Sequence, residues 1–210
     1  MKIILTSSGI NEAIKKAMAD MLAEIKIPKL AFIYTIRDPN DEQWLRECLE
    51  EFELLKVDYE KINISENRDF SKKNYFDIYY VAGGNTFYIL DRLKKTNLFS
   101  TIQKAVADGK IYIGTSAGSI IAGPDIEIAG YGPSGDENDL NLKDLQGLNL
   151  VPFNIYPHLI KSEEKVVRNY YKLTQKSVIA LADGQAVIVS EKGHKLIGFK
   201  KNSREIAYFH

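Results

Sequence analysis

Short β-branched runs alternate with amphipathic stretches through the first two thirds of the chain, and this alternation limits the possible folds most strongly. Two parallel strands need a long crossover between them, usually a helix. The pattern therefore predicts repeated strand–helix units around a mainly parallel sheet. The predicted strands are residues 2–5, 30–35, 57–62, 77–81, 111–115 and 178–182.

Apolar residues recur at helical spacing between these runs, and they predict helices over residues 10–25, 44–55 and 98–106. Asn11 is placed to cap the first helix, and Gly109 to end the third one before the next strand. The single cysteine, Cys48, falls on the apolar stripe of the second helix. We therefore interpret it as a core residue without chemistry.

The chain after residue 123 departs from the strand–helix pattern. Residues 123–150 are rich in Gly, Pro, Asp and Asn and have no clear period, which favours a functional loop that borders the active site. Three alternating apolar runs, 186–189, 195–199 and 205–209, predict antiparallel hairpins. Without an internal repeat, the 210 residues are predicted to form one domain over residues 1–210.

The composition excludes several classes of protein. The 28 Lys and Arg balance 28 Asp and Glu without a basic cluster, so a nucleic-acid partner is not expected. One cysteine can form neither an intramolecular disulfide nor a thiolate metal cluster. No signal-peptide core and no long apolar run is present, so we expect a cytoplasmic protein without a membrane partner. The oligomeric state stays open between monomer and homodimer.

The most specific local signal is the Gly-Thr-Ser-Ala-Gly segment at residues 114–118. It follows the apolar strand at 111–113 and precedes a short apolar stretch that is predicted to be helical. This is the strand–turn–helix context of a nucleophile elbow, in which flanking glycines relieve a crowded bend and the serine hydroxyl is raised to the sheet edge. We therefore predict Ser116 to be a nucleophile, the alternative being a tight turn with an inert serine.

A second glycine-rich turn, at residues 83–86, follows the strand at 77–81 and is expected at the same sheet edge. Bare backbone N–H groups there suit an oxyanion hole, made by Gly84 together with the N–H of Ala117. Gly83 would allow close approach of a substrate. The side chains of Asn85 and Thr86 are expected to contact the substrate, to cap the next helix, or to do both. No dinucleotide or Walker signature occurs, and no cofactor or metal is expected.

A serine hydroxyl needs a general base, and the chain has three histidines. His210 is the last residue, and His194 lies in a predicted hairpin tip. His158 follows an apolar run, at a position where open α/β sheets bind their ligands, so we predict it to be the base.

The base needs an acid to orient it. Asp183 follows the predicted strand at 178–182, although Asp-Gly between apolar runs is also a hairpin signal. Spacing alone leaves competing acids in the long loop, namely Asp125, Glu127, Asp136, Glu137 and Asp139.

The segments 83–86, 114–124, 154–158 and 181–184, in this order and spacing, resemble peptidase family S51, which comprises aspartyl dipeptidases and cyanophycinases. The resemblance implies a flavodoxin-like fold related to class I glutamine amidotransferases, a three-layer α/β sandwich. It also implies a triad in the chain order Ser116, His158, Asp183. The third member is a glutamate in the dipeptidase, and here the matching residue is Asp183, one methylene shorter.

The resemblance further implies a serine exopeptidase that hydrolyses small peptides, including dipeptides with N-terminal aspartate. In the dipeptidase an arginine-rich segment reads that aspartate. The matching segment here, residues 161–168, offers Lys161 and Arg168, whose other interpretation is solvated helix charges. Two alternatives remain: an esterase or amidase acting on non-peptide substrates, and a catalytically silent small-molecule-binding member of the fold.

Overall fold

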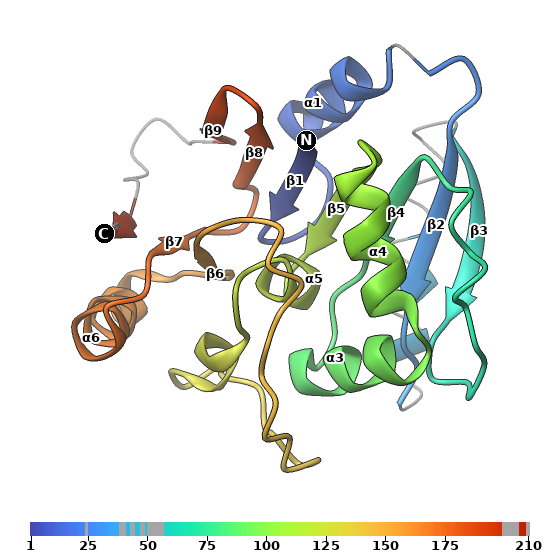
Figure 1. Cartoon of the computed structure of the whole chain (residues 1–210). Helices are drawn as coiled ribbons and strands as arrows, with labels where there is room; N and C mark the ends of the chain where they lie inside the picture. Colours follow the sequence, from blue (N-terminus) through green and yellow to red (C-terminus); the bar gives the residue numbers. More distant parts are fainter. Residues whose placement is uncertain are drawn as a thin grey trace.

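The computed structural model describes residues 1–23, 25–37, 41–42, 45–46, 49, 57–198 and 206–208 (Figure 1). Most of the helix expected over 44–55, including Cys48, lies outside the described residues, and so does His210.

Within these described residues, the main sheet has seven strands in the order β3-β2-β4-β5-β1-β8-β9. The first five of this order are parallel to one another, whereas β8 pairs antiparallel with β1 and with β9. The mainly parallel sheet and a C-terminal antiparallel hairpin are therefore confirmed. The strands are β1 (Lys2–Thr6), β2 (Lys29–Tyr34), β3 (Asp58–Asn63), β4 (Ile78–Val81), β5 (Ile111–Thr115), β8 (Ala186–Ser190) and β9 (Gly193–Ile197).

Helices cover both faces of this sheet and make a three-layer sandwich (Figure 1). Successive side chains of a strand point to opposite faces. Phe32 and Tyr80 accordingly pack with α1 (Glu12–Leu22) on one face. Tyr79 and Val81 pack on the other face with α3 (Thr86–Lys95), α4 (Leu98–Ala107) and α5 (Ala117–Ile121). The predicted three-layer α/β fold is thus confirmed.

The helix boundaries follow the predicted signals. Asn11 caps α1 by accepting a hydrogen bond from the N–H of Ile14 at 3.0 Å. After α4, Gly109 adopts a φ of 87°, a left-handed conformation that favours glycine, and the chain then turns into β5. No helix within the described part of the chain is long and apolar enough to cross a membrane.

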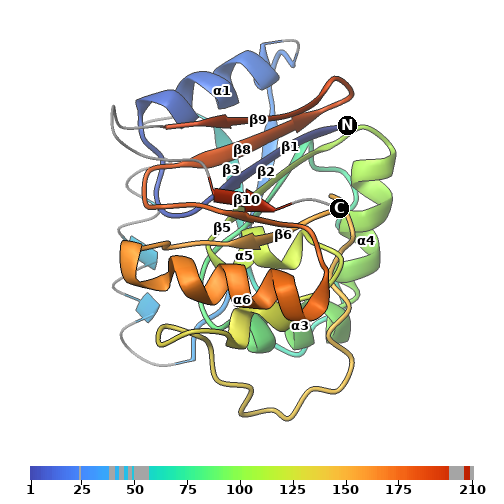
Figure 2. The same cartoon turned by 90° about the vertical axis from the view of Figure 1, so that its left-hand side faces the viewer.

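A second, smaller sheet lies beside the main one and was not expected (Figure 2). Its order is β10-β7-β6, built from β6 (Asn154–Tyr156), β7 (Val178–Ala180) and β10 (Ile206–Tyr208). Helix α6 (Glu164–Thr174) connects β6 to β7. The run at 178–182 was predicted as a strand of the parallel sheet, but it forms β7 of the small sheet instead. Both sides of β1 are already occupied, because β1 pairs with β5 on one side and with β8 on the other. The last strand pairs with β7 rather than continuing the β8–β9 hairpin.

Candidate active site

The segment at 114–118 forms a sharp turn between β5 and α5. Ser116 has a φ of 52° and a ψ of −113°, a strained conformation for a residue other than glycine. A Cβ at Gly118 would overlap the carbonyl group of Val81, and a Cβ at Gly114 would overlap that of Gly118. Both flanking glycines are thus required by close backbone approach, and the predicted strand–turn–helix geometry is present.

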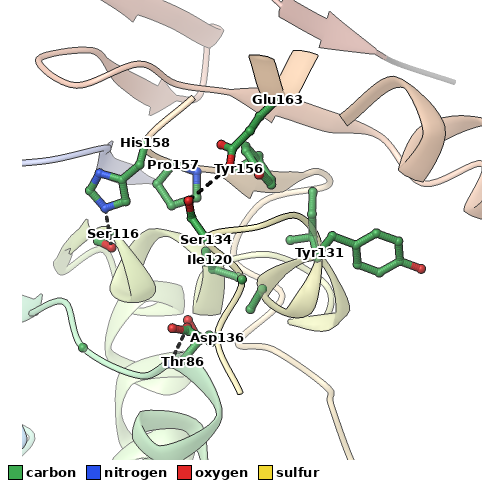
Figure 3. Close-up of a pocket in the computed structure, with 14 residues that line it drawn as sticks. Thr86, Ser116, Ile120, Tyr131, Ser134, Asp136, Tyr156, Pro157, His158 and Glu163 are labelled. Atoms are coloured by element: carbon green, nitrogen blue, oxygen red, sulfur yellow. Dashed lines mark hydrogen bonds between the residues drawn. The ribbon is translucent and has the colours of Figure 1, made fainter. Parts of the chain in front are cut away.

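A chain of hydrogen bonds joins the three side chains that the sequence singled out. His158 Nε2 lies 2.9 Å from Ser116 Oγ, and His158 Nδ1 lies 2.7 Å from Asp183 Oδ1. His158 follows β6 and has a φ of 55°, while Asp183 follows β7. Ser116 comes from the main sheet, so the chain of bonds crosses from one sheet to the other. Figure 3 shows the imidazole of His158 above the Ser116 hydroxyl.

Ser7, which no sequence motif had indicated, completes this hydrogen-bond system. Its side chain is fully buried directly after β1. Ser7 Oγ donates to Asp183 Oδ1 at 3.0 Å and accepts from the backbone N–H of His158 at 2.7 Å. The available signal was its position, since the carboxyl ends of parallel strands share one edge. Although partial burial opposes it, the hydrogen bonds from His158 and Ser7 hold the pKa of Asp183 below its ordinary value.

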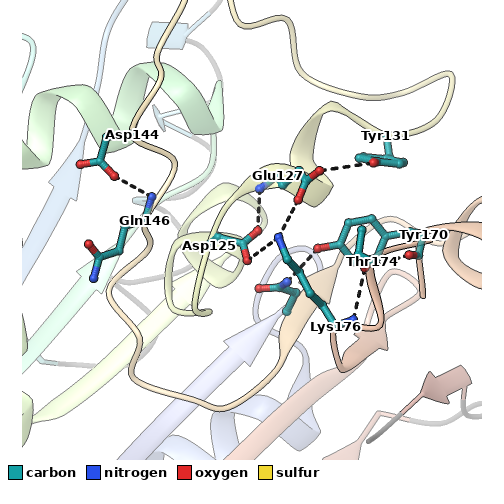
Figure 4. Close-up of polar contacts among 9 residues, drawn as sticks. Asp125, Glu127, Tyr131, Asp144, Gln146, Tyr170, Thr174 and Lys176 are labelled. Carbon is teal, nitrogen blue, oxygen red and sulfur yellow. Dashed lines mark hydrogen bonds and ion pairs between the residues drawn. The ribbon is translucent and has the colours of Figure 1, made fainter. Parts of the chain in front are cut away.

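The competing loop acids bind other groups. Asp125 and Glu127 both pair with Lys176, at 3.0 Å and 2.6 Å, and tie the loop to the segment between α6 and β7 (Figure 4). These pairs raise the pKa of Lys176 although burial alone would lower it. Asp136 accepts from the N–H of Thr86 at 2.8 Å, and Asp139 pairs with Arg37. None of the loop's described carboxylates is hydrogen-bonded to His158.

The turn after β4 brings Gly84 to the same pocket as Ser116, with a φ of 132° that favours glycine. Within the described residues, neither the N–H of Gly84 nor that of Ala117 donates a hydrogen bond. Gly83 lies directly before Gly84 in this turn. Asn85 caps α3, because its Oδ1 accepts from the N–H of Tyr88 at 2.9 Å. The structure thus shows the capping role of Asn85, and contact of Asn85 with the substrate stays a prediction.

Of the other two histidines, the structure describes only His194, which is not at this site. His194 lies on β9, the edge strand, three strands away from β5, and His210 is outside the described residues. Among the side chains that the structure describes, no group of three or more His, Cys, Asp or Glu is arranged to hold a metal ion.

Comparison with known proteins assigns the chain to a family. Residues 3–197 match the profile of peptidase family S51. The chain belongs to peptidase family S51. This match spans nearly the whole chain and includes each of the four residues in the hydrogen-bond system.

Individual S51 relatives agree with this assignment. An uncharacterized peptidase of Listeria monocytogenes is 34% identical over 154 residues, which cover 72% of this chain and 70% of that one. Peptidase E of a Nostoc species is 29% identical over 188 residues, or 83% of this chain and 74% of the relative. A crystal structure of a Listeria monocytogenes protein assigned as a peptidase E superposes with a TM-score of 0.76 at 24% identity, covering 95% and 98% of the two chains. That last likeness supports the fold.

The S51 site opens into a pocket of about 70 Å³ beside Ser116 and His158. Apolar walls come from Ile120, Ile128 and Ala129, and among the described residues the acidic side chains in the lining are Asp136 and Glu163. Figure 3 shows Ile120, Asp136 and Glu163 around the pocket. Lys161 and Arg168, which were considered for binding an acidic substrate, do not line this pocket. Lys161 lies in the 3₁₀ turn η2 (Lys161–Glu163), and Arg168 lies on α6, where Tyr208 helps to raise its pKa.

Proposed function

We propose that this S51 protein is a serine-type peptidase that hydrolyses amide bonds in small peptides. The observation that carries the proposal is the continuous chain of hydrogen bonds from Ser116 Oγ through His158 to Asp183. In such an arrangement the imidazole accepts the serine proton during attack, and the carboxylate orients the imidazole and stabilises its protonated form. Membership of a peptidase family supports amide bonds as the target.

In the acylation step, Ser116 Oγ forms a bond to the scissile carbonyl carbon while its proton passes to His158 Nε2. The carbonyl oxygen becomes negatively charged and accepts hydrogen bonds from the N–H groups of Gly84 and Ala117. When the carbon–nitrogen bond breaks, His158 returns the proton to the leaving amine. The first residue of the peptide then stays on Ser116 as an ester.

In the deacylation step, a water molecule takes the place of the leaving amine. His158 accepts its proton as the oxygen attacks the ester, and the proton then returns to Ser116 Oγ as the acid product leaves. Asp183 remains ionised throughout, which agrees with the lowered pKa of its carboxyl group. No step requires a cofactor.

The pocket argues for a short substrate and against a preference for N-terminal aspartate. Its volume of about 70 Å³ suits a small group. The charged side chains that line it, Asp136 and Glu163, would repel the carboxylate of an aspartate. A panel of dipeptides with varied first residue tests both statements, and aspartate is expected to rank below neutral residues.

The decisive variant is Ser116→Ala. We expect it to lower dipeptide hydrolysis by about 10⁴-fold or more, because it removes the attacking atom. A fluorophosphonate probe should label Ser116 in the wild-type protein and should not label the variant. Absence of labelling in the wild type would favour a silent binding protein, whereas labelling with turnover of acyl esters but of no dipeptide would favour an esterase.

A further inference from the structure

Glu163 is a buried carboxylate that the proposed reaction does not use. Its side chain lies in the pocket wall, and the residue is only 3% exposed. Its partners are hydroxyl groups: Ser134 Oγ donates to Glu163 Oε1 at 3.1 Å, and Tyr156 lies beside it. Burial and this neighbouring carboxylate raise the pKa of Tyr156 to about 12. Within the part of the chain that the structure describes, no Lys or Arg pairs with Glu163, although buried charges in proteins are normally paired.

A second polar group of the pocket is also left without a partner. Thr86 is fully buried and lines the pocket, and its Oγ1 has no hydrogen-bond partner among the described residues. Close to it, Asp136 uses Oδ2 to accept from the N–H of Thr86. Buried hydroxyl groups are rarely unsatisfied, so this oxygen points to a donor that a ligand brings. Figure 3 shows Thr86 and Asp136 on one side of the pocket and Glu163 on the other.

We propose that this pocket binds a primary ammonium group of the substrate's first residue, with Glu163 as its main anion. An ammonium group has three donors and a positive charge. Glu163 and Asp136 offer negatively charged acceptors and Thr86 offers a neutral one, and all three residues line the same small pocket. The proposal rests on the proposed function, because Ser116 and His158 line the same pocket and place the bound group next to the attacked carbonyl.

Two ammonium groups of a peptide have this chemistry, and a substrate panel separates them. The α-ammonium is removed in N-acetyl-Ala-Ala and present in Ala-Ala. A side-chain ammonium is present in Lys-Ala and absent from norleucyl-alanine, which has nearly the same length. A selective loss on acetylation identifies the α-ammonium, and a selective preference for lysine identifies the side chain.

The test variant is Glu163→Gln, which keeps the shape and the acceptor for Ser134 but removes the charge. We expect kcat/KM for the ammonium substrate to fall by about 10- to 100-fold, mostly through KM, with a much smaller change for its uncharged analogue. The matched control is Glu164→Gln, which removes the same charge one residue further along and outside the pocket. It should leave both values unchanged.

A second variant, Thr86→Val, distinguishes a loss of substrate binding from a folding defect. It removes a buried hydroxyl that has no partner within the described structure, so its melting temperature should hold or rise, while KM for the ammonium substrate should increase several-fold. A purely structural role would lower the melting temperature and leave KM in place. Equal losses on charged and uncharged substrates in Glu163→Gln would overturn the proposal.

Binding of n-butylammonium separates this inference from the proposed function. Nuclear magnetic resonance titration of the wild-type protein should show saturable binding that Glu163→Gln abolishes, whether or not peptides are hydrolysed. If Ser116 fails to react with a fluorophosphonate but n-butylammonium binds through Glu163, only the proposed function is wrong. If Ser116 reacts and dipeptides are cleaved without any ammonium dependence, only this inference is wrong.

Discussion

The hydroxyl of Ser7 contacts two parts of the hydrogen-bond system at once. It donates to Asp183 and accepts from the backbone N–H of His158, so it sets the position of both residues relative to β1. Because the group is fully buried, its removal leaves the N–H of His158 without this acceptor. Ser7 therefore supports His158 and Asp183 without touching the reacting atoms.

We expect Ser7→Ala to lower kcat by about 10-fold with little change in KM, which corresponds to the loss of about one such hydrogen bond in the transition state. Steady-state kinetics on one dipeptide measures both constants. Ser65→Ala is a suitable control, since the Ser65 hydroxyl also makes two hydrogen bonds, but both are to the backbone of Ile36 and neither is to His158 or Asp183. A change confined to KM would contradict a positioning role.

Asp183 allows a sharper comparison at the same scale. Asp183→Asn should reduce kcat by up to about 10⁴-fold, because an amide can hold His158 in the wrong tautomer and does not stabilise its protonated form. Asp183→Glu should retain more activity than Asp183→Asn, since it keeps the charge. Circular dichroism checks that both variants fold. Unchanged turnover in Asp183→Asn would assign the orienting role to another acid.

The sequence could indicate Ser116, His158 and Asp183 because each combines a reactive group with a strand end. It did not single out Ser7 or Glu163. Ser7 also follows a strand, but it belongs to no motif, and its role depends on the segments after β6 and β7, which it contacts through His158 and Asp183. Glu163 reads as one more helix charge, and only its burial separates it from Glu164.

At the scale of elements, Asp77 joins three neighbouring strands at the amino ends of the sheet. It accepts from the N–H of Lys29, the first residue of β2, at 3.2 Å and from Nζ of Lys110, just before β5, at 2.9 Å. Although burial opposes it, these contacts hold the pKa of Asp77 below its ordinary value. A carboxyl whose folded-state pKa is lowered stabilises the fold above its unfolded-state pKa.

We therefore expect Asp77→Asn to lower the free energy of unfolding by about 1 kcal/mol at pH 7. The difference from wild type should persist above the unfolded-state pKa, which is about 3.9 for an aspartate, and should vanish as the pH falls through the lower folded-state pKa. Urea unfolding at several pH values measures it. A difference that grows on acidification would contradict this account.

The elements themselves were predictable to unequal degrees. The parallel strands and α1 follow from local signals, namely buried β-branched runs, helical periodicity and the cap at Asn11. The small sheet does not, because β6, β7 and β10 have three residues each and their partners are distant in sequence. A short buried strand joins a sheet edge that the longer strands leave unpaired, and its own residues do not specify which edge that is.

At the scale of the whole molecule, the site lies where the two sheets meet. The main sheet supplies Ser7, Gly84 and Ser116, and the segments after β6 and β7 supply His158 and Asp183. A neutral net charge gave no hint of this region, whose pocket wall carries two carboxylates. The net charge follows from the sequence alone, whereas the charge around a pocket depends on how the chain folds.

The residues of the site are also divided between two parts of the sequence. Ser116 and both proposed oxyanion donors precede the exposed turn at Leu140 and Asn141, whereas His158 and Asp183 follow it. A chain cut between Leu140 and Asn141 would give one fragment with the nucleophile and another with the base and the acid. Strand β8 from the second fragment would have to insert beside β1 of the first.

We expect either fragment alone to be inert, and the mixture to regain fluorophosphonate labelling at Ser116 as the pieces associate. Mixing with a second fragment that carries His158→Ala is the control and should restore the fold without the reaction. Hydrolysis would then serve as a direct reporter of reassembly, and activity from the first fragment alone would contradict the expectation.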